Sequence, residues 1–324
     1  MTAALAEVPA GDWDALLDRL GYADAYYLHT YLETACLLEP GRAVLLHQGE
    51  SVFPFILRDV PGSDLRDATT PYGYGGPLGD RSFYDAYDEW CRDNGVVTTF
   101  LRFHPVFANQ RLAPERTRLE ELGTTIEWAF GPDDDLMTGM HPKHRNKVRK
   151  ARKAGLEVSV AESPADLSDF VSLYDETMAR LEAGSFYFFP PEYWRRLEHD
   201  PNIVRVDARF GDELAASALL LASRPWLHYH ASGTTERGRD AAAANLVVFE
   251  AGVWAQENGF RSFHLGGGVR SGKDSLYDFK VRFTPSGERE AWEGKLVHDP
   301  DAYRDLGGDP DDLRGFFPAY RRAD

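Results

Sequence analysis

The feature of this sequence that most restricts its fold is an order of structural elements that occurs twice. Residues 43–57 consist of two apolar runs, rich in strand-forming residues, on either side of Gly49, which predicts a β-hairpin. Residues 203–221 repeat this pattern around Gly211, which follows Gly49 by 162 positions. The chain is therefore expected to contain the same supersecondary unit in each half.

Each predicted hairpin is followed by a predicted helix that ends at an Asn-Gly pair. Residues 84–93 have helical periodicity and stop before Gly95, and residues 241–257 do so before Gly259, which lies 164 positions after Gly95. Glycine just after a helix provides a left-handed stop, and a strand-like run follows each stop. We interpret the chain as two copies of one α/β (α+β) unit, each a mixed, mainly antiparallel sheet flanked by helices. The alternative is a chance order in an ordinary α+β chain.

Length and composition limit the number of domains and the class of protein. A chain of 324 residues is long enough for two domains, which we place at residues 1–140 and 141–298, with a surface tail at 299–324. No apolar run reaches the roughly 18 residues that a membrane span requires, and the first residues lack a basic signal-like start, so a cytoplasmic location is expected. Cys36 and Cys91 lack metal-binding or disulfide spacing, and no metal site is expected.

Positive charge is concentrated in one short segment. The chain has a net charge of −16, yet residues 141–155 contain seven basic residues and no acidic one, including four of the seven lysines of the chain. An acidic body disfavours extensive groove binding of nucleic acid, whereas a local basic strip can hold a phosphate or carboxylate group. Contact with one end of a tRNA remains compatible with this distribution.

Four stretches resemble one known family. The basic run His144 to Gly155, residues 173–177, the segment ending in Gly266-Gly267-Gly268, and residues 274–280 are similar to the Fem-type aminoacyltransferases, which contain two GNAT-like units. The resemblance spans residues 20–297. It implies transfer of an aminoacyl group from aminoacyl-tRNA to the amine of a peptide acceptor, such as a UDP-linked or lipid-linked cell-wall precursor, without a cofactor. The acceptor end of a tRNA would then be a partner.

The resemblance also implies a catalytic residue. The Phe-Lys pair of the family lies at its reaction centre, and Lys280 matches it here, on a predicted helix that Asp274 would cap. A fixed cation stabilises the oxyanion that forms when an amine attacks an ester. The alternative is an ordinary surface lysine. Asp278, His264 and His230 are candidate proton acceptors, although each has a structural alternative.

The basic run is predicted to form a helix with Val148, Ala151 and Ala154 on its apolar face. We expect a subset of its cations to clamp an anionic group of the acceptor, and the alternative is a solvated face. The residues expected to bind substrate, in this helix and elsewhere, are Arg145, Lys147, Arg149, Tyr74, Tyr229, Tyr277, Phe279 and Arg282.

The competing donor is acyl-CoA, which GNAT enzymes hold by backbone amides in a glycine-rich loop at a helix N-terminus. The corresponding stretch, residues 237–243, places Arg237 and Arg239 at the cofactor if CoA is used. It contains one glycine, and the carboxylate of Asp240 would compete for the same amides, which disfavours CoA. A third alternative is a non-catalytic module of the same fold that holds a cell-wall precursor or peptide.

Overall fold

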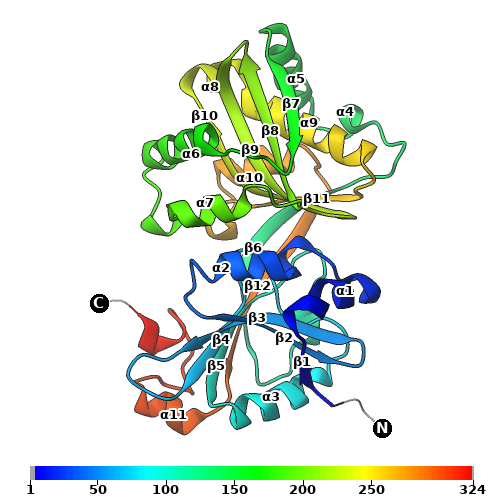
Figure 1. The fold of residues 1–324 in the computed structure, drawn as a ribbon. Helices are drawn as coiled ribbons and strands as arrows, with labels where there is room; N and C mark the ends of the chain where they lie inside the picture. Colours follow the sequence, from blue (N-terminus) through cyan, green and yellow to red (C-terminus); the bar gives the residue numbers. More distant parts are fainter. Residues whose placement is uncertain (1–3, 323–324) are drawn as a thin grey trace. The chain divides into compact units, whose positions relative to one another are not determined.

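The computed structural model describes residues 4–322, apart from the side chain of Arg270, and divides them into two compact units. Unit 2 is Thr124–Arg289, and unit 1 is formed by the residues before and after it. Each unit is built around a sheet covered by helices, and Figure 1 follows the chain through both. The chain is thus a mixed α/β protein, as predicted.

Unit 1 has the strand order β1-β2-β3-β4-β5-β12. β4 and β5 are parallel and the other neighbours are antiparallel. Helices α1 and α2 lie on one side of the sheet, and α3 and α11 lie on the other (Figure 1). The elements are β1 (Ala6–Glu7), α1 (Ala10–Leu20), η1 (Ala25–Tyr27), α2 (His29–Ala35), β2 (Arg42–Gln48), β3 (Ser51–Asp59), β4 (Arg66–Thr69), α3 (Phe83–Asp93), β5 (Val96–Arg102), η2 (Asn109–Leu112), β12 (Glu288–Val297), α11 (Pro300–Asp305) and η5 (Ala319–Arg321).

Unit 2 has the order β6-β11-β10-β9-β8-β7. Only β10 and β11 are parallel among these described pairs. The elements are β6 (Arg118–Ala129), α4 (Leu136–Gly139), α5 (Pro142–Lys153), β7 (Glu157–Glu162), α6 (Ser168–Arg180), η3 (Ser185–Tyr187), α7 (Pro191–Leu197), β8 (Ile203–Phe210), β9 (Glu213–Ser223), β10 (Trp226–Thr234), α8 (Glu236–Ala241), α9 (Ala243–Glu257), β11 (Ser262–Gly267), η4 (Val269–Ser271) and α10 (Ser275–Val281).

The duplicated plan predicted from the sequence is confirmed. Each unit contains an antiparallel hairpin, a third strand, a helical segment and a strand parallel to the third. The predicted turn glycines Gly49 and Gly211 and the predicted helix stops Gly95 and Gly259 all have positive φ, between 58° and 85°. These are left-handed conformations that glycine adopts without a steric cost.

The units differ from the predicted boundaries because the last strand of each sheet comes from the other half of the sequence. β6 precedes residue 140 but pairs with β11 in unit 2, and β12 precedes residue 299 but pairs with β5 in unit 1. The C-terminal segment, predicted as a surface tail, contributes Tyr303 and Phe317 to a core cluster with Val97 of unit 1. Cross-strand pairing and burial of these rings therefore decide where each unit ends.

In unit 2 helices cover both faces of the sheet. Alternate residues of β9, among them Ala218 and Leu220, face the core that α9 completes, and α6 packs on the other face of β9 and β10. Helix α5 lies against α9 (Figure 1). No helix within residues 4–322 combines the length and apolar character needed to cross a bilayer.

The predicted apolar face of the basic helix needs one correction. Val148 and Ala151 are buried, but Ala154 is exposed because α5 ends at Lys153. His144, one turn before Val148, is buried instead with 4% of its surface exposed. The helix therefore buries a narrow stripe that includes a histidine.

Candidate functional site

In unit 2 the two parallel strands run together and then part. β10 and β11 pair at three positions, of which His228–His264 is the last. β10 continues to Thr234 and β11 to Gly267, but in this stretch their described partners are only β9 and β6. A register irregularity at His230 in β10 and another after His264 in β11 follow the last pair. Such bulges bend a strand, which accounts for the separation.

Lys280 lies where the strands part. Its Nζ donates a hydrogen bond to the carbonyl oxygen of Gly267 in β11 at 2.7 Å. The same Nζ is 5.9 Å from the ring centroid of Tyr229 in β10. Only 8% of the residue is exposed, and burial lowers the pKa of its ammonium from 10.5 to about 8, against a raising effect of Asp274. At neutral pH the group is therefore a buried cation between the two strands.

Helix α10 is fixed in place by its N-cap, as the sequence predicted. Asp274 accepts hydrogen bonds from the backbone N–H groups of Leu276 and Tyr277 at 2.9 Å and of Val269 at 2.8 Å. A Cβ at Gly268 would lie 2.4 Å from a carboxylate oxygen of Asp274. The glycine run thus permits close backbone packing, and through Gly267 it accepts a hydrogen bond from Lys280.

The predicted proton acceptors lie in different environments. Asp278 is on the outer face of α10, where its half-exposed carboxylate pairs with Arg282 at 2.7 Å. His264 is 1% exposed and packs edge-to-face against His228, with ring centroids 5.7 Å apart, at the point where the strands part. Of Asp278 and His264, His264 is therefore the candidate that lies at the separation of the strands.

A tyrosine that the sequence did not single out contacts the third candidate. The hydroxyl of Tyr193 in α7 is 2.6 Å from Nε2 of His230, and burial, followed by the charge of His228, lowers the pKa of His230 to about 3. His230 is thus a neutral ring packed against Tyr193 and Phe189. No spacing in the sequence links these residues, since they come from α7 and β10.

The three cations predicted as a clamp have different surroundings. Nη1 of Arg145 donates to the carbonyl oxygens of Thr138 at 2.9 Å and Met140 at 3.0 Å, which ties α5 to α4 and to the α4–α5 connection. Lys147 and Arg149 are exposed, and Arg149 donates to the side-chain oxygen of Asn146 at 3.2 Å. Arg145 therefore contacts a segment outside α5, whereas the side chains of Lys147 and Arg149 form no such hydrogen bond within residues 4–322.

This contrast gives a stability prediction. Arg145→Ala is expected to lower the free energy of unfolding by about 1–2 kcal/mol, because two carbonyl groups lose a charged donor. Lys147→Ala, a matched exposed position on the same helix, is expected to change it by less than about 0.5 kcal/mol. Urea denaturation at neutral pH measures both. Equal effects of the two substitutions would show that the Arg145 contacts contribute nothing.

Two contacts join the basic helix to the helix that carries Lys280. Nε2 of the buried His144 donates to the carbonyl oxygen of Phe279 at 2.8 Å, and the N–H of His141 donates to the carbonyl oxygen of Arg282 at 2.9 Å. Burial lowers the pKa of His144 to about 4, so the ring is neutral. Helices α5 and α10 are thus neighbours in unit 2. The helical spacing of His144 and Val148 was the available sequence signal for this contact.

The aromatic residues predicted to line the site are distributed over both units. Tyr277 is buried and its hydroxyl donates to Glu288, whereas Phe279 packs against His144 and Phe283. Tyr229 lies over Lys280, as described above. Tyr74 belongs to unit 1, where its ring packs against Tyr26 and His104.

The stretch that would hold CoA is a helical turn, α8. Thr235 caps it by accepting from the N–H of Gly238 at 3.0 Å, and Arg239 donates its N–H to the carbonyl oxygen of Thr235 at 3.0 Å. The guanidinium of Arg237 pairs with Glu213 and lies 4.0 Å from the ring centroid of Phe210. Two backbone amides of this turn, those of Gly238 and Arg239, are therefore already used within it.

In unit 1 the corresponding parallel strands remain joined. After β4, the N–H of Thr70 donates to Phe100 at 3.1 Å and the N–H of Gly75 donates to Arg102 at 2.8 Å, so hydrogen bonding to β5 continues. The side chain of Asn109, not singled out by the sequence, donates to the carbonyl oxygen of Gly75 at 2.9 Å. We therefore assign the candidate site to unit 2.

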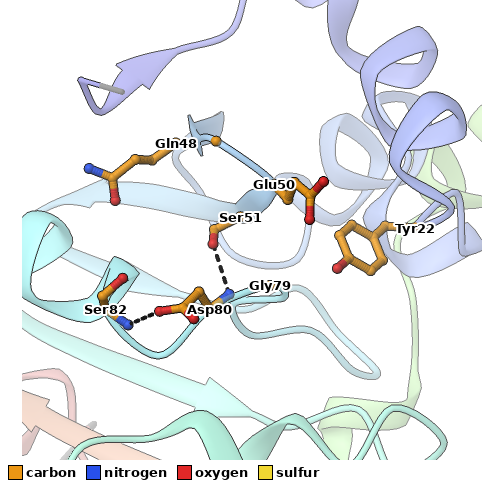
Figure 2. A pocket seen from close by; sticks show the side chains of 8 residues that line it. Tyr22, Gln48, Glu50, Ser51, Gly79, Asp80 and Ser82 are labelled. Carbon is orange, nitrogen blue, oxygen red and sulfur yellow. Dashed lines mark hydrogen bonds between the residues drawn. The ribbon is translucent and has the colours of Figure 1, made fainter. Parts of the chain in front are cut away.

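Unit 1 nevertheless contains surface pockets. Figure 2 shows one of about 420 Å³, in which Ser51 accepts from the N–H of Asp80 at 2.9 Å and Asp80 accepts from the N–H of Ser82 at 2.8 Å. A second, of about 610 Å³, lies between residues 115–119 and 310–314. None of the residues predicted to act on substrate lines either pocket.

Comparisons with known proteins agree with the observed fold. Residues 141–280 match the family model of the acetyltransferase (GNAT) domain. The crystal structure of FemX superposes with a TM-score of 0.70 at 14% identity, covering 93% of this chain and 98% of FemX. No curated protein matches the sequence.

Two further structures have the same fold. The C-terminal domain of a putative lysylphosphatidylglycerol synthetase from Agrobacterium fabrum superposes with a TM-score of 0.57 at 14% identity, covering 91% of this chain and 94% of that one. L-PGS from Bacillus licheniformis also gives 0.57, at 13% identity, covering 90% and 92%. Residues 141–280 are thus similar to the acetyltransferase (GNAT) domain, in a chain that shares its fold with FemX.

Proposed function

We propose that this protein transfers an aminoacyl group from an aminoacyl-tRNA to the amine of a peptide acceptor, of the kind found in UDP-linked or lipid-linked cell-wall precursors. The observation that carries the proposal is the buried ammonium of Lys280 at the point where β10 and β11 part. The fold shared with FemX and the resemblance of the sequence to Fem-type enzymes support it.

The chemistry follows from that ammonium group. It has three N–H donors, one of which is directed at Gly267, so others remain for a substrate oxygen. As the acceptor nitrogen bonds to the ester carbonyl carbon, negative charge develops on the carbonyl oxygen, and a buried cation stabilises it far better than an exposed one does. The carbon–oxygen bond to the ribose then breaks, and the ribose oxygen takes the proton that the amine loses. No covalent enzyme intermediate is needed.

Hydrogen bonding in α8 favours tRNA over CoA as the donor. The N–H groups of Gly238 and Arg239 bond to Thr235, and Arg237 is paired with Glu213, so a pyrophosphate bound to these groups would have to displace existing contacts. Transfer from an ester on tRNA requires no pyrophosphate site. Because charged tRNA is made in the cytoplasm, we place the reaction there.

A donor comparison tests this proposal. Incubation of the protein with a mixture of aminoacyl-tRNAs and a lysine-containing cell-wall precursor peptide should give an aminoacylated peptide, detected by mass spectrometry. Acetyl-CoA should give no acetylated peptide and should shift the melting temperature by less than about 1 °C, since a ligand stabilises only by binding the folded state.

The GNAT family match makes the CoA-dependent N-acyltransferase the second candidate. A clear thermal shift with acetyl-CoA, together with acetylated peptide, would replace the proposed donor by CoA. Binding of the precursor peptide without turnover from any donor would instead identify a non-catalytic binding protein.

A further inference from the structure

One face of α5 presents a row of lysines to solvent. Successive residues of an α-helix are rotated by about 100°, so the four lysines of α5 fall within about 120° of arc. All four are exposed, and the opposite stripe with Val148 is buried. We call this surface the lysine face; its members are Lys143, Lys147, Lys150 and Lys153.

Most of these lysines are not neutralised by the protein. Lys150 donates to the carbonyl oxygen of Asp240. The ammonium groups of Lys143, Lys147 and Lys153 take part in no hydrogen bond or ion pair among residues 4–322. Arg152, on the edge of the same helix, does pair with Glu250 at 2.7 Å. In a chain of net charge −16, three unpaired cations on one face remain available to an anionic partner.

The length of the lysine face distinguishes between kinds of anion. Ten residues separate Lys143 from Lys153, which corresponds to about 15 Å along the helix axis at 1.5 Å per residue. A single phosphate or carboxylate group would meet one or two of these side chains. A double-stranded nucleic acid carries one negative charge per about 1.7 Å of its axis, so it would meet all of them.

We propose that the lysine face binds the phosphate backbone of an RNA duplex, and that this duplex is the acceptor stem of the donor. This inference rests on the proposed function for the identity of the RNA. The contacts of α5 with α10 through His144 and His141 place the lysine face on a neighbour of the helix that carries Lys280. RNA held on α5 would therefore be bound by the same unit that contains the buried ammonium.

An anionic membrane fits the lysine face less well. A helix that binds a membrane surface inserts its apolar side, but the apolar side of α5 is buried in the core of unit 2. The large apolar side chains recorded as exposed in residues 4–322 lie outside α5.

Fluorescence anisotropy with an uncharged RNA hairpin that copies a tRNA acceptor stem tests the proposal. The full-length protein is compared with Lys143→Gln/Lys147→Gln/Lys153→Gln. Loss of three phosphate contacts should weaken binding at least about tenfold at about 50 mM salt and reduce the slope of log K against log salt by about 2–3. The control Arg180→Gln/Arg195→Gln/Arg196→Gln removes the same charge from α6 and α7 and should bind within about twofold of the original protein.

Three results would overturn the proposal. The first is absence of RNA binding by the original protein, and the second is an equal loss in both triple variants, which would reflect net charge alone. The third is unchanged RNA binding combined with loss of binding to phosphatidylglycerol vesicles, which would identify a membrane surface. Because the hairpin carries no aminoacyl group, failure of transfer in the donor comparison leaves this test unaffected.

Discussion

Lys280→Met is expected to lower kcat for aminoacyl transfer by about 10²–10³-fold, the usual effect of removing one oxyanion donor. Methionine has a similar length and fills the space between Tyr229 and Gly267, but it carries no charge and no N–H group. Since the ammonium acts on charge that develops only in the transition state, KM for the donor should change little. Steady-state kinetics with aminoacyl-tRNA and acceptor peptide measure both constants.

A matched control is Lys273→Met, which removes an exposed lysine of the same unit that pairs with Glu288 at 2.9 Å. It should retain the original kcat.

The pH dependence of stability gives a second readout for Lys280. Its folded pKa of about 8 lies below the unfolded value of 10.5, so the unfolded chain binds more protons between these values and the free energy of unfolding rises with pH in that window. This rise, about 3 kcal/mol for a shift of this size, should be missing in Lys280→Met. Unaltered kcat in the methionine variant would remove Lys280 from the mechanism.

Asp67→Asn is expected to lower the free energy of unfolding by about 3–5 kcal/mol. The carboxylate of Asp67 is 1% exposed and accepts from Nε of Arg58 at 2.7 Å and from Nε of Arg321. Arg58 is itself buried, so loss of the carboxylate leaves a cation without one of its two acidic partners, the other being Glu39. The C-terminal segment also loses its contact with β4 through Arg321. Urea denaturation measures the change, and limited proteolysis should cleave the C-terminal segment faster.

The control for this prediction is Asp59→Asn. Asp59 is also in unit 1 and faces an arginine, Arg66, at 3.7 Å, but its side chain is 92% exposed. Exposed pairs contribute little, so the expected change is below about 1 kcal/mol. Similar effects of the two substitutions would mean that burial of the Asp67 pair does not determine its contribution.

Local sequence signals were sufficient for the repeated unit. Strand-forming runs around Gly49 and Gly211, and helices that stop before Gly95 and Gly259, depend on interactions within about ten residues. The local sequence did not show that the last strand of each sheet comes from the other half of the chain. Whether β6 pairs with β11, and β12 with β5, depends on partners more than 100 residues away, for which no local pattern exists.

For the candidate site, residue type suggested the chemistry but not the environment of each group. Asp278 and Lys280 are two positions apart on α10, and the helix places the first in a half-exposed ion pair and the second among buried atoms. Arg145 and Lys147 were equivalent as sequence candidates, yet only Arg145 contacts the α4–α5 connection. Tyr193 had no signal at all, because its contact with His230 is made between α7 and β10.

The sequence by itself determined the duplicated α/β plan, the basic character of α5 and the cap of α10, since periodicity, turn residues and charge act over a few neighbouring positions. The tertiary structure alone decided which half of the sequence completes each sheet, which pair of parallel strands separates, and which lysine is buried there. These outcomes depend on burial and on hydrogen bonds between distant segments. The environment of Lys280, rather than its identity, is therefore what distinguishes it from the lysines of α5.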